Sequence, residues 1–380
     1  MKIKVINNIK GLEQIKQNWD LLLENSQSNT IFLTWEWINL WWEVFQDGRG
    51  LEILTFWDKK ELVGIAPFLR RKVRHFNMLP YERIEFLASG EDEQDEICSE
   101  YLNIIAKKNR ESEVIDKLIN YISENKFWEE IVLKELSDEN ISTAILLDRL
   151  KSSKLCYSVA PDGSAYYIDL PDSWGKMLKR LSSNFRYKIN RDRKKLEQRG
   201  QVSFKEVKKY EELSCIFDKL IALHQKRWFS AGQKGCFASS KFTDFHRKMI
   251  KILFERDRLR LCYLEFNGNI LAVSYDFIYK NNVYFYQSGF DMDFNGNIAV
   301  GNILRALCIE HYINKGIAKY DFLKGEGRHK TAWAATDKKI YAIRIRRRWT
   351  YKENIYYFLN QLRNISVSVR GFLKSGGQIR

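Results

Sequence analysis

Residues 283–301 read VYFYQSGFDMDFNGNIAVG. The first part is rich in aromatic and β-branched residues and predicts a strand, and the polar loop after it contains Gly296 and Gly301. A helix is predicted to begin at Gly301, so consecutive backbone N–H groups and the positive end of a helix dipole would converge on one point. This arrangement suits a pyrophosphate, although two glycines in a polar loop also form ordinary turns.

The segments around this stretch predict an antiparallel meander crossed by helices. Asn267-Gly268-Asn269 lies between two apolar runs, and an Asn-Gly turn is among the strongest hairpin signals. Strands are predicted at 202–207, 259–266, 270–279, 283–289 and 318–323, and helices at 172–198, 213–229, 241–256 and 301–315.

The N-terminal half is predicted to have a similar order of elements. Its predicted helices are 12–25, 34–45, 111–125 and 142–152, and its predicted strands are 51–57, 62–70, 84–88, 101–105, 130–136 and one near Tyr157. Thr34 is the expected N-cap of the second helix. Helices interspersed with hairpin strands indicate an α/β (α+β) fold with a mixed sheet in each half.

The length of 380 residues favours two domains of ordinary size. The stretch Pro161-Asp162-Gly163 forms turns readily and is the expected boundary. We therefore predict an N-terminal domain at 1–160, a C-terminal domain at 161–340 and a basic C-terminal extension at 341–380.

Composition limits the class of protein. Hydrophobic residues make up 45% of the chain and only four residues are proline, which is a globular composition. No run approaches the ~20 apolar residues that cross a bilayer, and the first residues do not resemble a signal peptide. Six scattered cysteines without a CxxC pair favour free thiols in a reducing cytoplasm over disulfides or a zinc site.

The formal charge of +15 attracts anions such as phosphorylated cofactors, nucleic acid or acidic lipid surfaces. Two clusters carry much of it. The second half of the helix predicted at 172–198, from residue 186 to Arg199 just after its end, contains seven basic residues, Arg186, Lys188, Arg191, Arg193, Lys194, Lys195 and Arg199. Arg344, Arg346, Arg347 and Arg348 alternate in part with isoleucines and suggest an edge strand, followed by an aromatic amphipathic helix near 356–362. Each cluster is either a solvated face or a contact for an anionic partner.

The order of several short motifs resembles the CelD-like acetyltransferase family. The motifs are Leu223-His224, Arg227-Trp228, Gln287-Ser288-Gly289-Phe290-Asp291, Val300-Gly301, the run from Tyr320 to Gly325, and His329-Lys330 with Trp333; Trp35-Glu36-Trp37 and Trp41-Trp42 also fit. That family belongs to the GNAT superfamily and is related to the Fem-type aminoacyl transferases of peptidoglycan synthesis. The resemblance implies two tandem GNAT-like domains, each a mixed, mostly antiparallel sheet flanked by helices, with the donor site in the second.

By position, the resemblance implies that acyl-CoA, such as acetyl-CoA, binds with its pyrophosphate at the loop 295–302. The expected donor contacts are Gln287, Gly289, Asn295, Gly296, Asn297, Ala299, Val300, Gly301 and Asn302. Similar proteins often have Ser or Pro where Ala299 stands, which leaves the donor open. The expected acceptor contacts are Arg186, Arg191, Arg227, Trp228, Tyr286, Asp291 and Trp333. No metal is expected.

Acyl transfer to an amine requires that the amine lose a proton and that the tetrahedral oxygen be stabilised. The candidate bases are Asp321, Glu326, His329 and His224; Lys330 is the counterpart by motif of a lysine that stabilises negative charge in Fem-type enzymes. Without a Gly-x-Ser-x-Gly elbow, direct attack is preferred to an acyl-enzyme. Alternatively, Asp321 pairs with an arginine or caps a helix, His224 is structural and Lys330 is solvated.

The preferred function is an N-acyltransferase that modifies an amino sugar or nucleotide-linked sugar in polysaccharide or cell-envelope synthesis. A cytoplasmic location is expected, with the basic clusters available for contact with the inner face of the membrane or a synthase complex. One alternative keeps the fold and uses aminoacyl-tRNA as the donor. Another is a noncatalytic protein that binds anions or a membrane surface. DNA is not an expected partner, because aromatic residues do not interleave with the basic clusters.

Overall fold

The computed structural model describes residues 1–75, 79–294, 297–325 and 327–347, and only the backbone of residues 75, 79, 328 and 329. Its helices are α1 (Ile9–Gln14), α2 (Lys16–Glu24), α3 (Trp35–Phe45), α4 (Glu111–Glu124), α5 (Ile141–Ser152), α6 (Trp174–Arg180), α7 (Ser183–Glu197), α8 (Leu213–Ser230), α9 (Ser240–Glu255), α10 (Val300–Asn314) and α11 (Arg328–Thr331). Its strands are β1 (Lys2–Ile6), β2 (Arg49–Leu51), β3 (Ile53–Asp58), β4 (Glu61–Ala66), β5 (Phe68–His75), β6 (Leu79–Phe86), β7 (Ile105–Ala106), β8 (Glu130–Ser137), β9 (Cys156–Asp169), β10 (Val202–Glu206), β11 (Leu259–Phe266), β12 (Asn269–Tyr279), β13 (Asn282–Phe290), β14 (Lys319–Lys324) and β15 (Thr336–Arg346).

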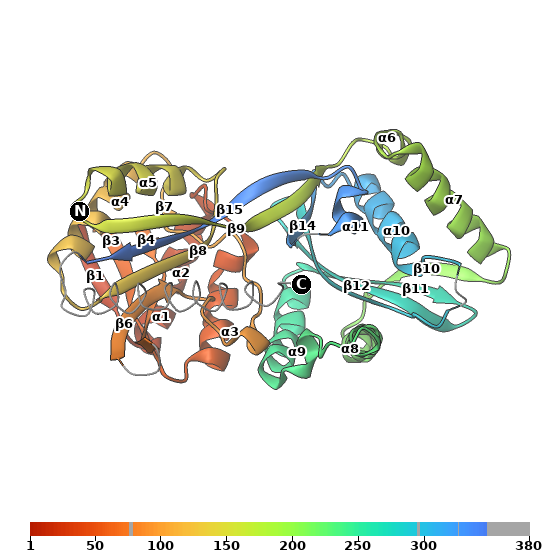
Figure 1. Cartoon of the computed structure of the whole chain (residues 1–380), viewed down its shortest axis with the longest axis horizontal. Helices are drawn as coiled ribbons and strands as arrows, with labels where there is room; N and C mark the ends of the chain where they lie inside the picture. The colour runs from red at the N-terminus through yellow and green to blue at the C-terminus, as the bar shows by residue number, and fades with distance from the viewer. Residues whose placement is uncertain (76–78, 295–296, 326, 348–380) are drawn as a thin grey trace, which may run out of the picture.

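One long sheet joins two lobes (Figure 1). Its strand order is β10-β11-β12-β13-β14-β9-β15-β8-β6-β5-β2. Neighbouring strands are antiparallel except for the parallel pairs β13–β14 and β6–β8. A separate four-stranded sheet, β1-β3-β4-β7, belongs to the N-terminal lobe. The predicted mixed, mostly antiparallel α/β fold is therefore confirmed.

The strands β9 and β15 connect the lobes. They pair along their whole length, from Thr336 opposite Tyr167 to Arg346 opposite Cys156. Residues 165–169 of β9 also pair with β14, in the C-terminal lobe. Residues 340–346 of β15 also pair with β8, in the N-terminal lobe, so this strand pair continues the sheet from one lobe to the other. Because β9 runs through Pro161-Asp162-Gly163 without interruption, the division of the chain at residue 160 remains a prediction.

Helices cover both faces of the C-terminal half of the sheet. Helices α6, α7 and α10 lie on one face and α8 and α9 on the other (Figure 1). The first face has its own hydrophobic core, which includes Ile189, Ile309 and Trp333. The second face shares one core with the N-terminal lobe, so that Phe245 of α9 and Trp37 of α3 pack edge to face with ring centroids 5.1 Å apart. This shared core holds the lobes together.

Most predicted elements are present, and the predicted Asn-Gly hairpin is the turn between β11 and β12. The single helix predicted at 172–198 is wrong, because the chain breaks between α6 and α7. Leu181 is extended, and the Ser182 hydroxyl caps α7 by accepting a hydrogen bond from the N–H of Phe185 at 3.3 Å. Serine competes for backbone partners in this way, and such residues favour helix starts over helix interiors.

Other predicted boundaries change for local reasons. The strand expected at 101–105 shrinks to β7, because Tyr101 has φ = 56°, a left-handed conformation that ends an extended segment. Thr34 does occupy the N-cap of α3, but its hydroxyl donates to the carbonyl of Ile31 at 2.7 Å instead of accepting from the helix.

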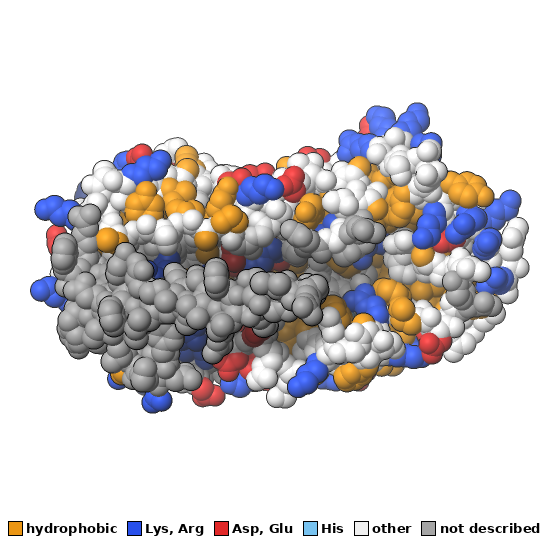
Figure 2. Space-filling view, in the orientation of Figure 1, with side chains coloured by type: hydrophobic (Ala, Val, Ile, Leu, Met, Phe, Trp, Pro, Cys, Tyr) orange, Lys and Arg blue, Asp and Glu red, His pale blue; other side chains and the backbone are white. Residues whose placement is uncertain are grey.

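The two basic clusters have different environments. Residues 344–346 do not form an edge strand, because β15 lies between β9 and β8, where Glu130 accepts from Arg344 at 2.9 Å and from Arg346 at 3.3 Å. Lys and Arg side chains over α6 and α7 remain on the surface (Figure 2). The exposed members there are Lys176, Lys179, Arg180, Lys188, Lys194, Lys195 and Arg199, which we call the α6–α7 basic face. Arg348 and the helix predicted at 356–362 lie outside the described residues.

Among the described residues, no helix combines the length and the apolar character that crossing a bilayer requires. All six cysteines carry free thiols.

Gly289 lets β13 approach helix α8 closely. A Cβ atom at this position would lie 2.7 Å from the carbonyl oxygen of Leu220 and 2.8 Å from the backbone nitrogen of His224. Backbone atoms cannot rotate away as a flexible side chain can, so the helix or the strand would have to move.

We therefore expect Gly289→Ala to lower the free energy of unfolding by about 1–3 kcal/mol, the usual range for overpacking. Urea denaturation measures this change. Gly175→Ala in α6 is the matched control, because nothing lies within 4 Å of the added methyl group. Equal stability of the two variants would contradict the close packing of β13 on α8.

Candidate functional site

The strands β13 and β14 separate soon after they begin to pair. Their parallel pairing joins Asn282–Tyr284 to Lys319–Asp321, whereas β13 continues to Phe290 and β14 to Lys324. In the described chain, the β13 edge that faces β14 therefore carries no strand partner beyond Tyr284. Unpaired backbone N–H and C=O groups along such an edge are available to a ligand.

A pocket of about 490 Å³ lies beside this open edge. We call it the β13 pocket; its lining residues are Arg227, Phe285, Gln287, Ser288, Phe290, Met292, Phe294, Ile298, Ala299, Val300, Gly301, Asn302 and Arg305. It thus brings together five of the predicted donor contacts, Gln287 on β13 and residues 299–302 at the start of α10. Asn295 and Gly296 lie outside the described residues.

The first turn of α10 presents its N-terminal end to the β13 pocket. The N–H of Ala299 donates to the carboxylate of Asp192 at 3.2 Å, and the N–H of Asn302 bonds back to the carbonyl of Ala299 at 2.9 Å. Within the described chain, the N–H of Gly301 has no acceptor. An unpaired N–H at the positive end of a 15-residue helix is suited to an anion.

Two predicted donor contacts lie elsewhere. Gly289 serves the packing of α8, as described above, and Asn297 is exposed without lining the β13 pocket. Of the predicted acceptor contacts, Asp291 also lies outside the pocket lining, with its carboxylate accepting from the N–H of Asp293 at 3.1 Å.

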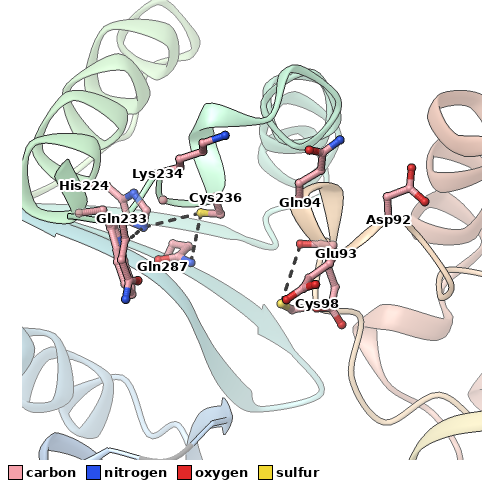
Figure 3. Close-up of a pocket in the computed structure, with 12 residues that line it drawn as sticks. Asp92, Glu93, Gln94, Cys98, His224, Gln233, Lys234, Cys236 and Gln287 are labelled. Carbon is pink, nitrogen blue, oxygen red and sulfur yellow. Dashed lines mark hydrogen bonds between the residues drawn. The ribbon is translucent and has the colours of Figure 1, made fainter. Parts of the chain in front are cut away.

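A larger pocket of about 840 Å³ lies between the lobes (Figure 3). One wall is the segment 92–98 of the N-terminal lobe, and the opposite wall comes from α8, the loop 233–236 and β13. We call it the acidic pocket; its lining residues are Asp92, Glu93, Gln94, Glu96, Cys98, His224, Trp228, Gln233, Lys234, Gly235, Cys236 and Gln287. Gln287 lines both pockets, so the two cavities meet at this side chain.

The acidic wall gives this pocket a negative character in a strongly basic chain. Asp92, Glu93 and Glu96 make no ion pair with any described residue, and Lys234 is the cation on the opposite wall. The segment is held in place by neighbouring groups: the hydroxyl of Ser239 donates to Asp95 at 2.7 Å, and the phenol of Tyr286 donates to the carbonyl of Ile97. The wall is therefore anchored to the C-terminal lobe.

His224 lies buried at the back of the acidic pocket. Its Nε2 accepts from the indole N–H of Trp228 at 2.8 Å and lies 3.6 Å from the sulfur of Cys236, while Nδ1 lies 3.1 Å from Oε1 of Gln225. These partners suit a neutral imidazole protonated on Nδ1. Burial lowers the pKa of His224 to about 4 and raises that of Cys236 to about 12. The lone pair that a base would use is therefore occupied.

Asp321 lies at the contact between the lobes. The phenol of Tyr101 donates one forked hydrogen bond to the two carboxylate oxygens of Asp321, at 2.9 and 3.0 Å, and the carboxylate also accepts from the N–H of Leu323 at 2.8 Å and from Lys338 at 3.2 Å. It lines a separate polar pocket of about 220 Å³, which we call the seam pocket, and neither of the other two. The sequence left three roles open for Asp321: a catalytic base, a helix cap or the partner of an arginine. In the structure its cationic partner is Lys338.

Lys330 is buried against the end of β14. Its ammonium donates to the carbonyls of Leu323 at 2.8 Å and Lys324 at 2.7 Å, which closes the turn after the strand. Leu323 and Gly325 both have positive φ angles, 62° and 110°. The pairing of β14 with β9 also shifts register between Asp321 and Leu323, as at a β-bulge. Burial lowers the pKa of Lys330 to about 8, and nearby Glu100 opposes that shift. Glu326 and the side chain of His329 lie outside the described residues.

The remaining predicted acceptor contacts divide between pocket and core. Arg227 lines the β13 pocket and Trp228 the acidic pocket. Tyr286 is held by His246 at 2.9 Å, and Trp333 is fully buried against Phe185. Arg186 donates to the carbonyl of Leu178 at 3.4 Å, and Arg191 pairs with Asp192 at 2.7 Å.

Sequence reasoning missed several residues of these pockets. Asp92, Glu93 and Glu96 belong to an acidic run that could have been noticed beside the basic remainder of the chain. Arg305 and Lys338 carry no local signal, because only the fold brings them to β13 and Asp321. In the described chain, no group of three or more His, Cys, Asp or Glu side chains is placed to hold a metal ion.

Comparison with protein families gives a match to the acetyltransferase (GNAT) domain over residues 183–331. This range contains the β13 pocket and the residues of α8 and β13 that line the acidic pocket. Residues 183–331 therefore match a GNAT acetyltransferase domain, as the motif resemblance implied, and this match supports an acyltransferase. A search of curated proteins gave no match.

Solved structures share the fold at low identity. FemX has a TM-score of 0.60 at 10% identity, over 90% of this chain and 97% of FemX. A conserved protein of unknown function from Bacteroides thetaiotaomicron has a TM-score of 0.52 at 10% identity, over 91% of this chain and all of the other. L-PGS from Bacillus licheniformis has a TM-score of 0.51 at 10% identity, over 92% and 95%. The common architecture includes both lobes.

The burial of neutral His224 makes stability depend on pH. Its pKa lies at about 4 in the folded chain against 6.5 for an unperturbed imidazole, so the unfolded chain binds the proton more tightly. The contribution of His224 to stability is fully present above pH 6.5 and is lost as the pH falls towards 4. The free energy of unfolding of the wild type should fall between pH 7.5 and pH 5.5. We expect this fall to be smaller by about 1–2 kcal/mol in His224→Gln, which lacks the titrating imidazole.

Urea denaturation at pH 7.5 and pH 5.5 measures this difference for wild type and variant. The measurement at pH 7.5 is the control, because the imidazole is neutral in both states there. If the two proteins lost the same stability between these pH values, His224 would not be a buried neutral side chain.

Proposed function

We propose that this chain transfers an acyl group from an acyl-CoA thioester to an amine, with the donor in the β13 pocket and the acceptor in the acidic pocket. The observation that carries the proposal is that the two cavities are neighbours: Gln287, on the part of β13 that has no β14 partner, lines both.

The β13 pocket has features that match each part of such a donor. The N–H groups of the first turn of α10, with that of Gly301 among them, and the positive end of the helix suit the diphosphate. The open strand edge can pair with the amide groups of a pantetheine arm, as a sheet edge pairs with an extended peptide. One extra residue, Tyr286, bulges between the β12 partners Tyr275 and Asp276, next to Gln287. Such a bulge redirects the strand where the thioester would meet the acceptor.

The acidic pocket supports an amine acceptor. An amine is an ammonium ion before it reacts, and the carboxylates of Asp92, Glu93 and Glu96 attract that charge. A carboxylate on this wall can also accept the proton that the amine must lose before its lone pair attacks the thioester. His224 is poorly placed for this role, since Trp228 and Cys236 occupy its Nε2.

The acceptor class follows from the motif resemblance together with this pocket. The CelD-like motifs favour an amino sugar or a nucleotide-linked amino sugar of polysaccharide or cell-envelope synthesis. A cavity of about 840 Å³ with hydrogen-bonding groups on both walls can hold a molecule of that size.

A second candidate uses aminoacyl-tRNA as the donor. The α6–α7 basic face favours it, because seven exposed cations on neighbouring helices suit a phosphate backbone. The likeness to FemX is a likeness of fold. The two candidates differ in which donor the chain binds.

Calorimetric titration tests the donor. We expect CoA to bind the wild type and Gly301→Val to bind it at least tenfold more weakly, because the side chain enters the first turn of α10 beside Phe290. Gly175→Val is the matched control and should bind CoA like the wild type, since no atom lies within 4 Å of its Cβ position. Binding of aminoacyl-tRNA without binding of CoA would replace the first donor by the second.

Steady-state kinetics with acetyl-CoA and glucosamine tests the acceptor pocket. We expect Glu96→Gln to raise the KM for glucosamine severalfold and to leave the KM for acetyl-CoA unchanged, because the carboxylate attracts only the amine. Glu255→Gln, at the exposed end of α9, removes the same charge away from the pocket. Equal values of the glucosamine KM in both variants, or no turnover by the wild type, would count against this acceptor assignment.

A further inference from the structure

Arg305 lies where the strands β13 and β14 part. Its guanidinium lies 4.0 Å from the ring centre of Phe285 on β13 and 5.6 Å from that of Phe322 on β14. These two aromatic residues are the first beyond the last paired residues, Tyr284 and Asp321. The side chain therefore occupies the apex between the separated strands and lines the β13 pocket.

This guanidinium has no anionic contact in the described chain. Its Nε is buried without a hydrogen-bond partner, and no carboxylate lies within ion-pair distance. Asp276 acts on it only from a distance and is itself engaged, since it accepts from Ser274 at 2.7 Å and from Tyr312 at 2.8 Å. Aromatic rings stabilise a desolvated cation only in part, so this guanidinium lacks a counter-charge among the residues that the structure describes.

A second arginine faces the same pocket. The guanidinium of Arg227 lies 5.1 Å from the ring centre of Phe290 and 5.3 Å from that of Trp228, again without a carboxylate partner. Burial lowers the pKa of Arg227, and the charge of Arg305, which lines the same pocket, lowers it further, so the two cations repel each other. The N-terminal end of α10 adds positive potential beside them. Three positive groups thus surround one cavity.

We propose that Arg305, together with Arg227, forms an anion-binding subsite for the donor at the apex between β13 and β14. The proposal rests on the assignment of the donor to the β13 pocket. A bound anion removes the repulsion between the two guanidinium groups and supplies the missing counter-charge. Two parts of a CoA thioester can provide that anion: the diphosphate, or a carboxylate on the acyl group of a dicarboxylic thioester such as succinyl-CoA.

Calorimetry with inorganic pyrophosphate, CoA, acetyl-CoA and succinyl-CoA tests the subsite. We expect Arg305→Gln to weaken CoA and pyrophosphate binding at least tenfold and Arg305→Lys to weaken it less, because lysine keeps the charge but loses the planar fork. Arg74→Gln, which removes an exposed charge from β5 in the other lobe, should change binding less than twofold. Equal losses for acetyl-CoA and succinyl-CoA identify the diphosphate as the anion, and a loss confined to succinyl-CoA identifies the acyl carboxylate.

Thermal unfolding without ligand separates this role from a structural one. Removal of an uncompensated buried charge should leave the Tm of Arg305→Gln equal to or above that of the wild type. A Tm several degrees lower would mean that Arg305 holds the fold, and it would overturn the proposal. Unchanged affinity of Arg305→Gln for all four probes would do the same.

The outcomes also separate the subsite from the proposed donor. If the wild type binds pyrophosphate through Arg305 but does not bind CoA, the subsite stands and the acyl-CoA assignment fails. If CoA, acetyl-CoA and succinyl-CoA each bind equally to wild type and Arg305→Gln, the donor assignment stands and the subsite fails. A wild type that binds none of the four probes contradicts both.

Discussion

The early separation of β13 from β14 is the constraint on which the site depends. Three paired residues align the strands, and just beyond them the guanidinium of Arg305 lies over the rings of Phe285 and Phe322, one on each strand. A sheet with an open edge inside it would normally close or recruit another strand. Here the edge is bordered by α10 and by a pocket, so its backbone groups remain available to a ligand.

The second requirement is a fixed position of the N-terminal lobe. Three kinds of contact supply it: the pairing of β9 with β15 across both halves of the sheet, the shared core around Trp37 and Phe245, and the bonds from Tyr101 and Lys338 to Asp321. These contacts bring the acidic segment 92–98 opposite α8 and β13. The acidic pocket therefore exists only when both lobes are present, although the family match covers only residues 183–331.

The two pockets, which share Gln287, carry charges of opposite sign. Arg227, Arg305 and the start of α10 make the β13 pocket positive, while the segment 92–96 makes one wall of the acidic pocket negative. An anionic donor and a cationic amine would thus be drawn to different cavities and would meet at Gln287. Such separation keeps each reactant from occupying the other's site. The acidic wall thus lies, in a chain of charge +15, at the pocket that we propose for the amine.

The sequence alone determined the elements whose signals are local. Periodicity and the Asn-Gly turn predicted the β11–β12–β13 meander, because strand and turn preferences act over a few residues. The anion site that the loop before α10 suggests stays a prediction. Only the tertiary structure decided the roles of Asp321, Lys330 and Trp333, since each depends on partners distant in the chain. Strand pairing in the sheet brings Lys338 of β15 next to Asp321 of β14. The packing of α10 on the sheet brings Arg305 over Phe285 of β13. No local sequence pattern relates the residues of either pair.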